Sequence, residues 1–384
     1  MRIGRRRFMK AAAGGALAAL ALRGAGRAIA NPKQTPIDRH LAWVWRFDDD
    51  GDPAEIRDRL VQQRAGILLK THDGSTYMGK WDASWGGVTG PEKVRELAEF
   101  FESAGVPFHA WSVTRGVDPV REAEVAAEVL ANGARSLTFD LEPAEGKAYW
   151  QRGPAEAMQI GWELRRLMPD AYLVVAPDPR PWQLEVVPIG EFASFCDEIA
   201  PQTYWDTFDS PANYRLFEMF GYPPGPDGIT PEHVLTVTNQ ALAPHGRPIR
   251  PVGQGAASHE EWARFLQTAE SLGMGEASFW RFRTAGDGVW QALSESVARK
   301  QEQSKQAALK TQPRDNPAPA GQGKGAGPKV DSPRAKTEDA QEEADGAAGA
   351  PANRPYRNLP RFRSQYRLDV APSRNRSLLP GGRE

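Results

Sequence analysis

The chain has 384 residues, of which 40% are hydrophobic and 12 are tryptophan, so it can bury the core of one large domain or two ordinary ones. The first 30 residues carry seven Arg or Lys and no acid, and those from Arg299 on carry 17 bases and 10 acids, which leaves 24 bases against 39 acids between them. This acidic middle argues against nucleic acid as a ligand, because neutralising phosphates requires Lys and Arg. Cys196 is the only cysteine, which excludes an intrachain disulfide and a zinc site built from cysteines.

Residues 1–30 are expected to be an export signal rather than part of the fold. Arg5 and Arg6 precede a short apolar run rich in Ala and Gly, residues 11–22, and this pattern resembles a twin-arginine (Tat) signal. A small-x-small pattern predicts cleavage after Ala30. The alternative is an uncleaved anchor, although the apolar run is short for a membrane span. We therefore expect a protein that is periplasmic or extracellular.

Short apolar runs alternate eight times with helical patterns in the middle of the chain. The strands are predicted at residues 41–46, 66–70, 108–113, 136–142, 172–176, 198–205, 249–254 and 277–282. The helices are predicted at residues 53–63, 91–104, 119–131, 154–167, 188–195, 211–220, 231–243, 258–272 and 288–298. Eight strand–helix units in about 260 residues predict an α/β fold, the (β/α)8 TIM barrel. An open doubly wound sheet is the alternative, but no Gly-rich phosphate loop follows the first strand.

The barrel domain is expected to cover residues 31–298, and the composition changes after it. Residues 300–353 are rich in Gln, Ala, Pro, Gly, Lys and Glu and contain no aromatic residue, so a disordered tail is predicted over residues 299–384. Residues 354–367 interleave Arg with Tyr and Phe, a composition suited to contact with an anionic polymer or a membrane surface. The alternative is a solvated tail without a specific partner. We expect the protein to be a monomer.

Two acids mark the end of the fourth predicted strand. Asp140 and Glu142 are two residues apart, so their side chains project to the same side, with Cα atoms roughly 6–7 Å apart. Folding alone gains nothing from this pair, because close acids repel and resist desolvation. Catalysis gains if one acid stays ionised while the other is held protonated. The alternative is a solvated strand end that caps the following helix.

Other polar and aromatic residues also fall where predicted strands end, which is the end where TIM barrels build their active sites. They are Lys70, Trp111, Asp178, Gln202, Tyr204, Asp206, Gln254 and Trp280. Carboxylates serve acid–base chemistry, amides bind hydroxyl groups and indoles stack on pyranose faces. The set therefore predicts a site for a polysaccharide or cell-wall glycan.

The sequence indicates neither a metal nor a nucleotide cofactor. The histidines lie far apart without ligand spacing, and no P-loop or dinucleotide fingerprint is present. His109 on the third predicted strand would come near Asp140, which leaves a metal-dependent polysaccharide deacetylase open as an alternative.

The fourth-strand motif resembles that of glycoside-hydrolase TIM barrels. The similarity is to uncharacterised bacterial and phage glycosyl hydrolases related to the family 18 chitinases and the family 25 lysozyme-like barrels. Residues 139–142 are similar to the end of the chitinase motif, which implies that Glu142 is the proton donor and that Asp140 orients the N-acetyl group of the substrate. The two earlier acids of the full motif would fall at Ser136 and Thr138, and neither is acidic.

The sixth and eighth strands extend the resemblance. Residues 202–206 are similar to the chitinase sixth-strand motif, which implies that Tyr204 and Asp206 contact the acetamido group. Trp280 is at the position where chitinases commonly have a tryptophan that forms the bottom of the sugar subsite. The first predicted strand ends at Arg46, where lysozyme-like barrels normally have an Asp.

These observations predict an exported glycoside hydrolase that acts on N-acetylated or cell-envelope polysaccharide. Glu142 would be the general acid, its pKa raised by Asp140 and by burial, and the other residues would bind sugar, with Trp111 and Trp280 as the stacking floor. Substrate-assisted cleavage would need no protein nucleophile. The second hypothesis is a non-catalytic carbohydrate-binding barrel, which an ordinary Glu142 pKa would favour. The deacetylase is the third.

Overall fold

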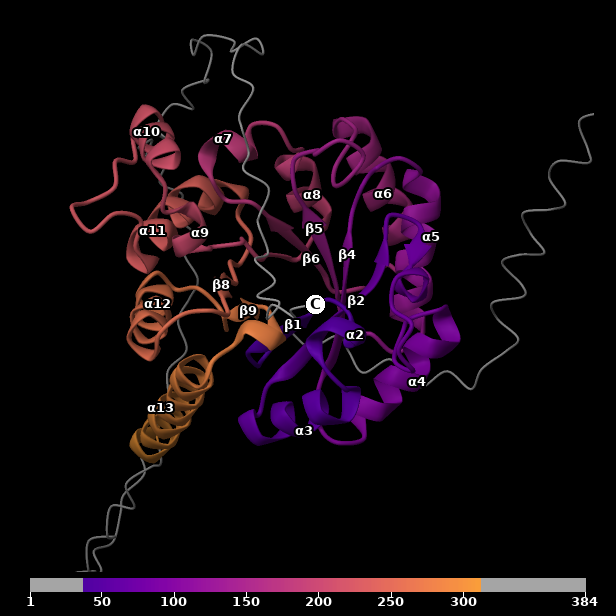
Figure 1. Cartoon of the computed structure of the whole chain (residues 1–384), viewed down its shortest axis with the longest axis horizontal. Coiled ribbons are helices and arrows are strands. Elements are labelled where there is room, and N and C mark those ends of the chain that lie inside the picture. The colour runs from indigo at the N-terminus through magenta and orange to yellow at the C-terminus, as the bar shows by residue number, and fades with distance from the viewer. Residues whose placement is uncertain (1–36, 312–384) are drawn as a thin grey trace, which may run out of the picture. The chain divides into compact units, whose positions relative to one another are not determined.

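The computed structural model describes residues 37–311, so the expected signal segment and most of the expected tail lie outside the described residues. Eight parallel strands stand at the centre and helices surround them (Figure 1). The parallel strands are β1 (Leu41–Val44), β2 (Gly66–Asp73), β4 (Phe108–Val113), β5 (Leu137–Leu141), β6 (Leu173–Pro177), β7 (Glu198–Ile199), β8 (Val252–Gln254) and β9 (Ser278–Trp280). Each corresponds to a predicted strand.

The sheet closes into a barrel. Its order is β7-β6-β5-β4-β2-β1-β9-β8, and β3 (Thr76–Tyr77) pairs antiparallel with β2 outside this path. The seam between β7 and β8 is joined by isolated parallel bridges, Ile199 with Ile249 and Gln202 with Val252. The (β/α)8 prediction is therefore confirmed, and the open sheet is wrong.

The helices begin where the sequence offers proline or a capping side chain. They are α2 (Phe47–Asp50), α3 (Pro53–Gln63), α4 (Pro91–Glu102), α5 (Pro119–Ala131), α6 (Pro154–Leu167), α7 (Pro181–Leu184), α8 (Ile189–Phe195), α9 (Trp205–Phe208), α10 (Pro211–Met219), α11 (Pro231–Leu242), α12 (His259–Ser271) and α13 (Asp287–Thr311), with short 3-10 turns η1 (Met78–Lys80), η2 (Ala243–His245) and η3 (Phe282–Thr284). Asp52 and Asp118, for example, accept a backbone N–H at the starts of α3 and α5, and proline follows each of them. Within the described part of the chain no helix is both long and apolar enough to cross a membrane.

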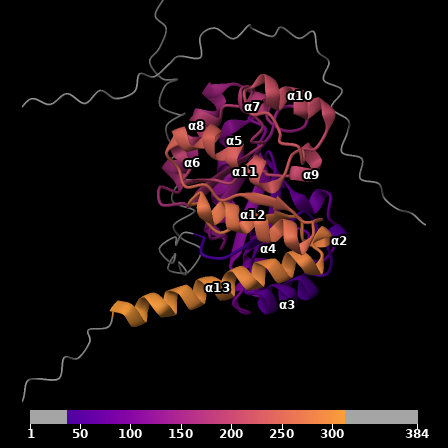
Figure 2. The ribbon, with the colours of Figure 1, turned by 90° about the vertical axis from the view of Figure 1, so that its left-hand side faces the viewer.

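Two predicted boundaries differ most from the structure. The sixth strand was expected over residues 198–205, but β7 ends at Ile199 because Pro201 has no N–H to continue the ladder. Tyr204 and Asp206 therefore lie in the following turn and in α9. The last helix passes the boundary expected at 298 and runs to Thr311, through strong helix formers such as Gln, Lys and Ala (Figure 2).

The apolar core has two layers. The larger one lies between strands and helices. The smaller one fills the barrel and includes Leu41, Trp43, Trp111, Val174 and Val252. Half-buried aromatic side chains pack against this inner cluster, and they are Trp45, Tyr149, Tyr172, Tyr204 and Trp280. We call the end of the barrel at which the parallel strands terminate the mouth, and the opposite end the base.

Candidate active site

The two acids of β5 meet one amide at the mouth. Asp140 is buried, and Glu142 directly after the strand is half-buried. The Gln202 Nε2 atom donates to Asp140 Oδ1 at 2.8 Å and to Glu142 Oε1 at 3.2 Å. One donor group reaching both carboxyl groups shows that the two acids project to the same side, as their spacing predicts.

Both acids have raised pKa values. Burial is the largest cause for Asp140, followed by the negative charge of Glu142. Burial also raises the pKa of Glu142 to about 7, and the charge of Asp178 adds to it. Hydrogen bonds from Gln202 and Asp140 act in the opposite direction on Glu142. The prediction that burial raises the Glu142 pKa is therefore confirmed, but the part assigned to Asp140 is wrong, because the neighbouring charge that raises this pKa belongs to Asp178. The pair holds a proton near neutral pH and can deliver it.

Asp178, at the end of β6, forms an ion pair with Arg180. Arg180 Nε lies 3.0 Å from both Asp178 carboxylate oxygens, and Arg180 Nη1 donates to Asn213 Oδ1 at 3.4 Å. Asp178 was predicted to hold sugar hydroxyls, but the structure commits it to Arg180. Its effect on the site is the charge that it presents to Glu142.

The residues predicted on the sixth and seventh strands separate into two groups. The half-buried Tyr204 lies by the acids, since burial and then the charges of Asp140 and Glu142 raise its pKa. Asp206 is exposed at the rim, and its backbone N–H donates to Gln254 Oε1 at 2.9 Å. Gln254 is thus a bridge between strand ends, whereas Tyr204, like Gln202, faces the carboxyl pair.

Lys70 is buried on β2 rather than presented to solvent. Its Nζ lies 2.9 Å from Asp73 Oδ2 and 5.1 Å from the centroid of the Trp111 ring. The Lys70 charge lowers the pKa of Asp140, against the larger effect of burial. Lys70 was predicted to bind substrate, but its ammonium is already paired within the protein, and it acts on the site through Asp140.

The two tryptophans predicted as a stacking floor differ in exposure. Trp111 is only 2% exposed and its Nε1 donates to the Val44 carbonyl at 3.1 Å, so its ring has no face for a sugar. Trp280 is half-buried, and its ring meets those of Trp43 and Trp111 edge-on, with centroids 5.9 and 5.5 Å apart. The prediction for Trp111 is therefore wrong, because Trp111 lies beneath Trp280 and supports it.

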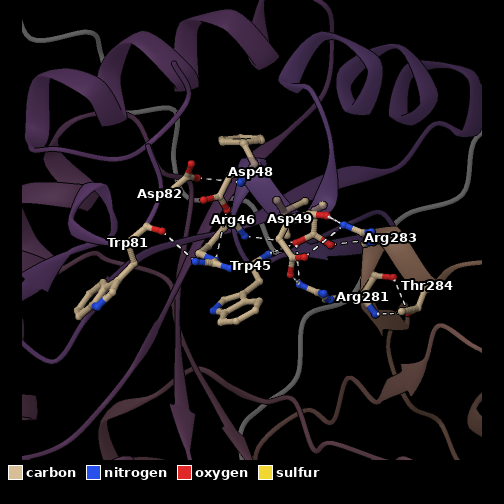
Figure 3. Close-up of polar contacts among 12 residues, drawn as sticks. Trp45, Arg46, Asp48, Asp49, Trp81, Asp82, Arg281, Arg283 and Thr284 are labelled. Carbon is tan, nitrogen blue, oxygen red and sulfur yellow. Dashed lines mark hydrogen bonds and ion pairs between the residues drawn. The ribbon is translucent and has the colours of Figure 1, made fainter. Parts of the chain in front are cut away.

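A set of polar contacts, the polar clamp, joins the segments that follow the first and eighth barrel strands (Figure 3). Asp50 accepts the Trp45 N–H at 2.7 Å and the Arg283 N–H at 3.3 Å, and Arg281 Nη1 lies 2.6 Å from Asp49 Oδ2. The Arg281 guanidinium also lies 5.1 Å from the Trp45 ring. The clamp holds the corner at which β9 ends, and the peptide bond between Trp280 and Arg281 in that corner is cis.

His109 does not approach the carboxyl pair. Its Nδ1 lies 2.8 Å from Ser136 Oγ, at the start of β5, and burial lowers its pKa to about 3. Across residues 37–311 no group of three or more His, Cys, Asp or Glu side chains is placed to hold a metal ion. The predicted approach of His109 to Asp140 is wrong, because Asp140 pairs with Val113, and His109 lies four residues before Val113 on β4, toward the base.

Tyr149 is the member of the mouth that sequence reasoning missed. It lies in the loop after β5, is half-buried, and packs against the inner cluster as Tyr204 does. The loop has no periodic pattern, and the backbone conformation that turns this residue inward has no signal in the sequence.

No protein-family model and no curated protein matches the chain. Similar solved structures include catalytic-site mutants of active domain 2 of a thermostable chitinase from Pyrococcus furiosus, complexed with chito-oligosaccharides, at 15% identity and a TM-score of 0.46 over 71% of this chain and 98% of that one. A glycoside hydrolase family 18 N-acetylglucosaminidase from Paenibacillus barengoltzii matches at 9% identity and a TM-score of 0.49, over 67% and 99% of the two chains. A chitinase from Rhizomucor miehei matches at 12% and 0.47, over 67% and 100%. These similarities are too distant to assign an activity, which has to be argued from the residues at the mouth.

Proposed function

We propose that the protein is a glycoside hydrolase that acts on N-acetylated polysaccharide. The observation that carries this proposal is the pair formed by Asp140 and Glu142, held by one amide at the mouth of a TIM barrel, with both pKa values raised. A carboxyl group with a pKa of about 7 is half protonated at neutral pH, which suits a general acid. A barrel that only bound saccharide would have no use for it.

The chemistry follows from the positions of the two acids. Glu142 gives its proton to the glycosidic oxygen as the bond from that oxygen to the anomeric carbon breaks. The carbonyl oxygen of the substrate's acetamido group forms a bond to the same carbon, oriented by Asp140. Water then attacks this carbon and displaces the acetamido oxygen from it, and Glu142 takes the water's proton, which restores both the acetamido group and the acid. Asp73 and Asp178, whose charges act on the pair, are both in ion pairs, so a route without a protein nucleophile fits the site.

The test is release of new reducing ends from a panel of N-acetylated and cell-wall glycans. The mature protein should release them, and Glu142→Gln should lower kcat by about 10²- to 10⁴-fold, the usual contribution of a general acid. Glu260→Gln, at an exposed position on α12, is the matched control and should change nothing. Equal turnover by wild type and Glu142→Gln would refute the assignment of the acid. Saccharide binding without any release would favour the binding barrel instead.

We also propose that the protein is exported through the twin-arginine pathway and works as a monomer outside the cytoplasm. The Arg5–Arg6 pair and the apolar run after it support export. Replacing both arginines by lysine should leave the protein in the cytoplasm, as measured by cell fractionation. The interleaved Arg and aromatic residues of 354–367 support contact with an anionic polymer or membrane surface. Binding to anionic vesicles that ends when this segment is deleted would test that contact.

A further inference from the structure

The loop after β5 is fastened to the strand that carries the acids. The Trp150 N–H donates to the Glu142 carbonyl at 3.0 Å, and the Gln151 N–H donates to the Arg115 carbonyl at 2.9 Å. The Trp150 side chain is buried, with its ring 5.3 Å from that of Phe192. The residue before Trp150 is therefore held at a fixed place beside the end of β5.

That residue, Tyr149, has a left-handed backbone with a φ of 56°. Among the described residues the one other non-glycine with positive φ is Arg64, which ends α3 in the way that helices commonly end. A side chain at such a φ is unfavourable, and glycine would adopt it freely. A tyrosine at this position indicates that the side chain has a use at the mouth, since strained residues gather at functional sites.

The hydroxyl of Tyr149 is a free donor among acids. Within residues 37–306, where side chains are described, no hydrogen bond involves it, although the ring is half-buried against the inner cluster. The charge of Glu142 is the largest cause of its raised pKa, followed by burial and the charge of Asp140. For Tyr204 the order of the two charges is reversed, with Asp140 before Glu142. The hydrogen bond from the Trp150 N–H to the Glu142 carbonyl sets Tyr149 on the Glu142 side of the carboxyl pair. Tyr204 follows Gln202 by two residues, and the amide of Gln202 lies nearer Asp140 than Glu142, which sets Tyr204 on the Asp140 side.

We propose that the Tyr149 hydroxyl donates a hydrogen bond to the sugar that leaves when the glycosidic bond breaks. This inference rests on the proposed function, in which Glu142 protonates the leaving oxygen and Asp140 serves the acetamido group of the retained sugar. A donor beside Glu142 lies next to the departing sugar. Tyr204, beside Asp140, lies next to the retained one. The two tyrosine hydroxyls therefore contact different sugars of the substrate.

The experiment compares two leaving groups on the same retained sugar. Tyr149→Phe should lower kcat/KM for an N-acetylglucosamine oligosaccharide by about 10- to 100-fold, the effect expected for one lost hydrogen bond at a partly charged site. With a 2,4-dinitrophenyl glycoside, which has no departing sugar to hold, the loss should stay below about threefold. Tyr204→Phe should lower both rates. Tyr222→Phe, at a half-buried tyrosine on the outside of the barrel, is the matched control and should lower neither.

Binding separates the failure of this inference from the failure of the proposed function. The probe is the same oligosaccharide, titrated calorimetrically into Glu142→Gln and into the double variant Glu142→Gln/Tyr149→Phe. Turnover by wild type with equal losses for both leaving groups, or with no loss, overturns the role of Tyr149 and leaves the hydrolase intact. No turnover, but binding weakened about tenfold in the double variant, overturns the hydrolase and keeps the sugar contact. Neither turnover nor binding overturns both.

Discussion

One buried pair at the base of the barrel and one at its mouth treat their charge in opposite ways. At the base, Arg250 Nε lies 2.5 Å from Glu198 Oε1, and the Tyr172 hydroxyl donates to Glu198 Oε2 at 2.7 Å. At the mouth, Asp140 and Glu142 share the amide of Gln202, and the charge of Glu142 raises the pKa of Asp140. Buried charges that serve the fold find partners inside the protein, whereas charges that face a ligand keep part of their capacity free. The difference supports the proposal that the active site lies at the mouth.

The largest expected change in the free energy of unfolding follows a substitution at the base. Arg250→Met should lower the free energy of unfolding by about 3–5 kcal/mol, because it leaves the buried Glu198 carboxylate without its partner. Urea denaturation measures this, and kcat of the protein that remains folded should be unchanged. Adding Glu198→Gln to Arg250→Met should restore part of the loss by removing the stranded charge. If Arg250→Met kept its stability but lost activity, the pair at the base would not have the purely structural role assigned to it here.

At the mouth, by contrast, substituting a buried acid should raise the free energy of unfolding. Folding raises the pKa of Glu142 from 4.5 to about 7, so the folded state holds this proton more tightly than the unfolded state, and stability falls as pH rises between these two values. Glu142→Gln removes that loss and should stabilise the protein by about 1–3 kcal/mol at pH 8, with little effect at pH 4. Thermal unfolding of both proteins across this pH range measures the effect. The contrast fails if Glu142→Gln destabilises the protein at pH 8.

The smallest expected effect distinguishes the two tryptophans. In a Glu142→Gln background, Trp280→Ala should weaken oligosaccharide binding by about 1–2 kcal/mol, since it removes a half-exposed aromatic face. Trp111→Phe should change the Kd by less than about threefold, because the Trp111 ring is covered on the inside of the barrel. Titration calorimetry measures both. Equal weakening by the two substitutions, in folded protein, would place Trp111 in the site.

Most of the fold could be predicted, because its signals are local. The strands are short apolar runs, and several helices start at a proline, so β4, α3, α5 and α6 have the predicted bounds. The ends of β7 and α13 could not be placed as well, since each depends on a balance between local propensity and the rest of the barrel.

The site was predictable in composition but less so in geometry. Asp140 and Glu142 follow from a two-residue spacing that any strand enforces. The covering of Trp111 depends on how side chains from several strands share the inside of the barrel. The pairing of Asp178 with Arg180, and the inward turn of Tyr149, depend on loop conformations that no periodic pattern encodes. Sequence reasoning therefore located the mouth but did not assign each side chain its task.

The last helix fixes where the chain departs from the barrel. α13 starts beside the mouth, where Asp287 pairs with Arg59, and reaches the base, where Lys300 pairs with Glu276. Beyond Lys300 its side chains are exposed through Gln306, and the helix continues to Thr311 (Figure 2). These last 11 residues add about 17 Å of spacer at 1.5 Å per residue. The end of the described helix is thus set at the pole of the barrel opposite the acids.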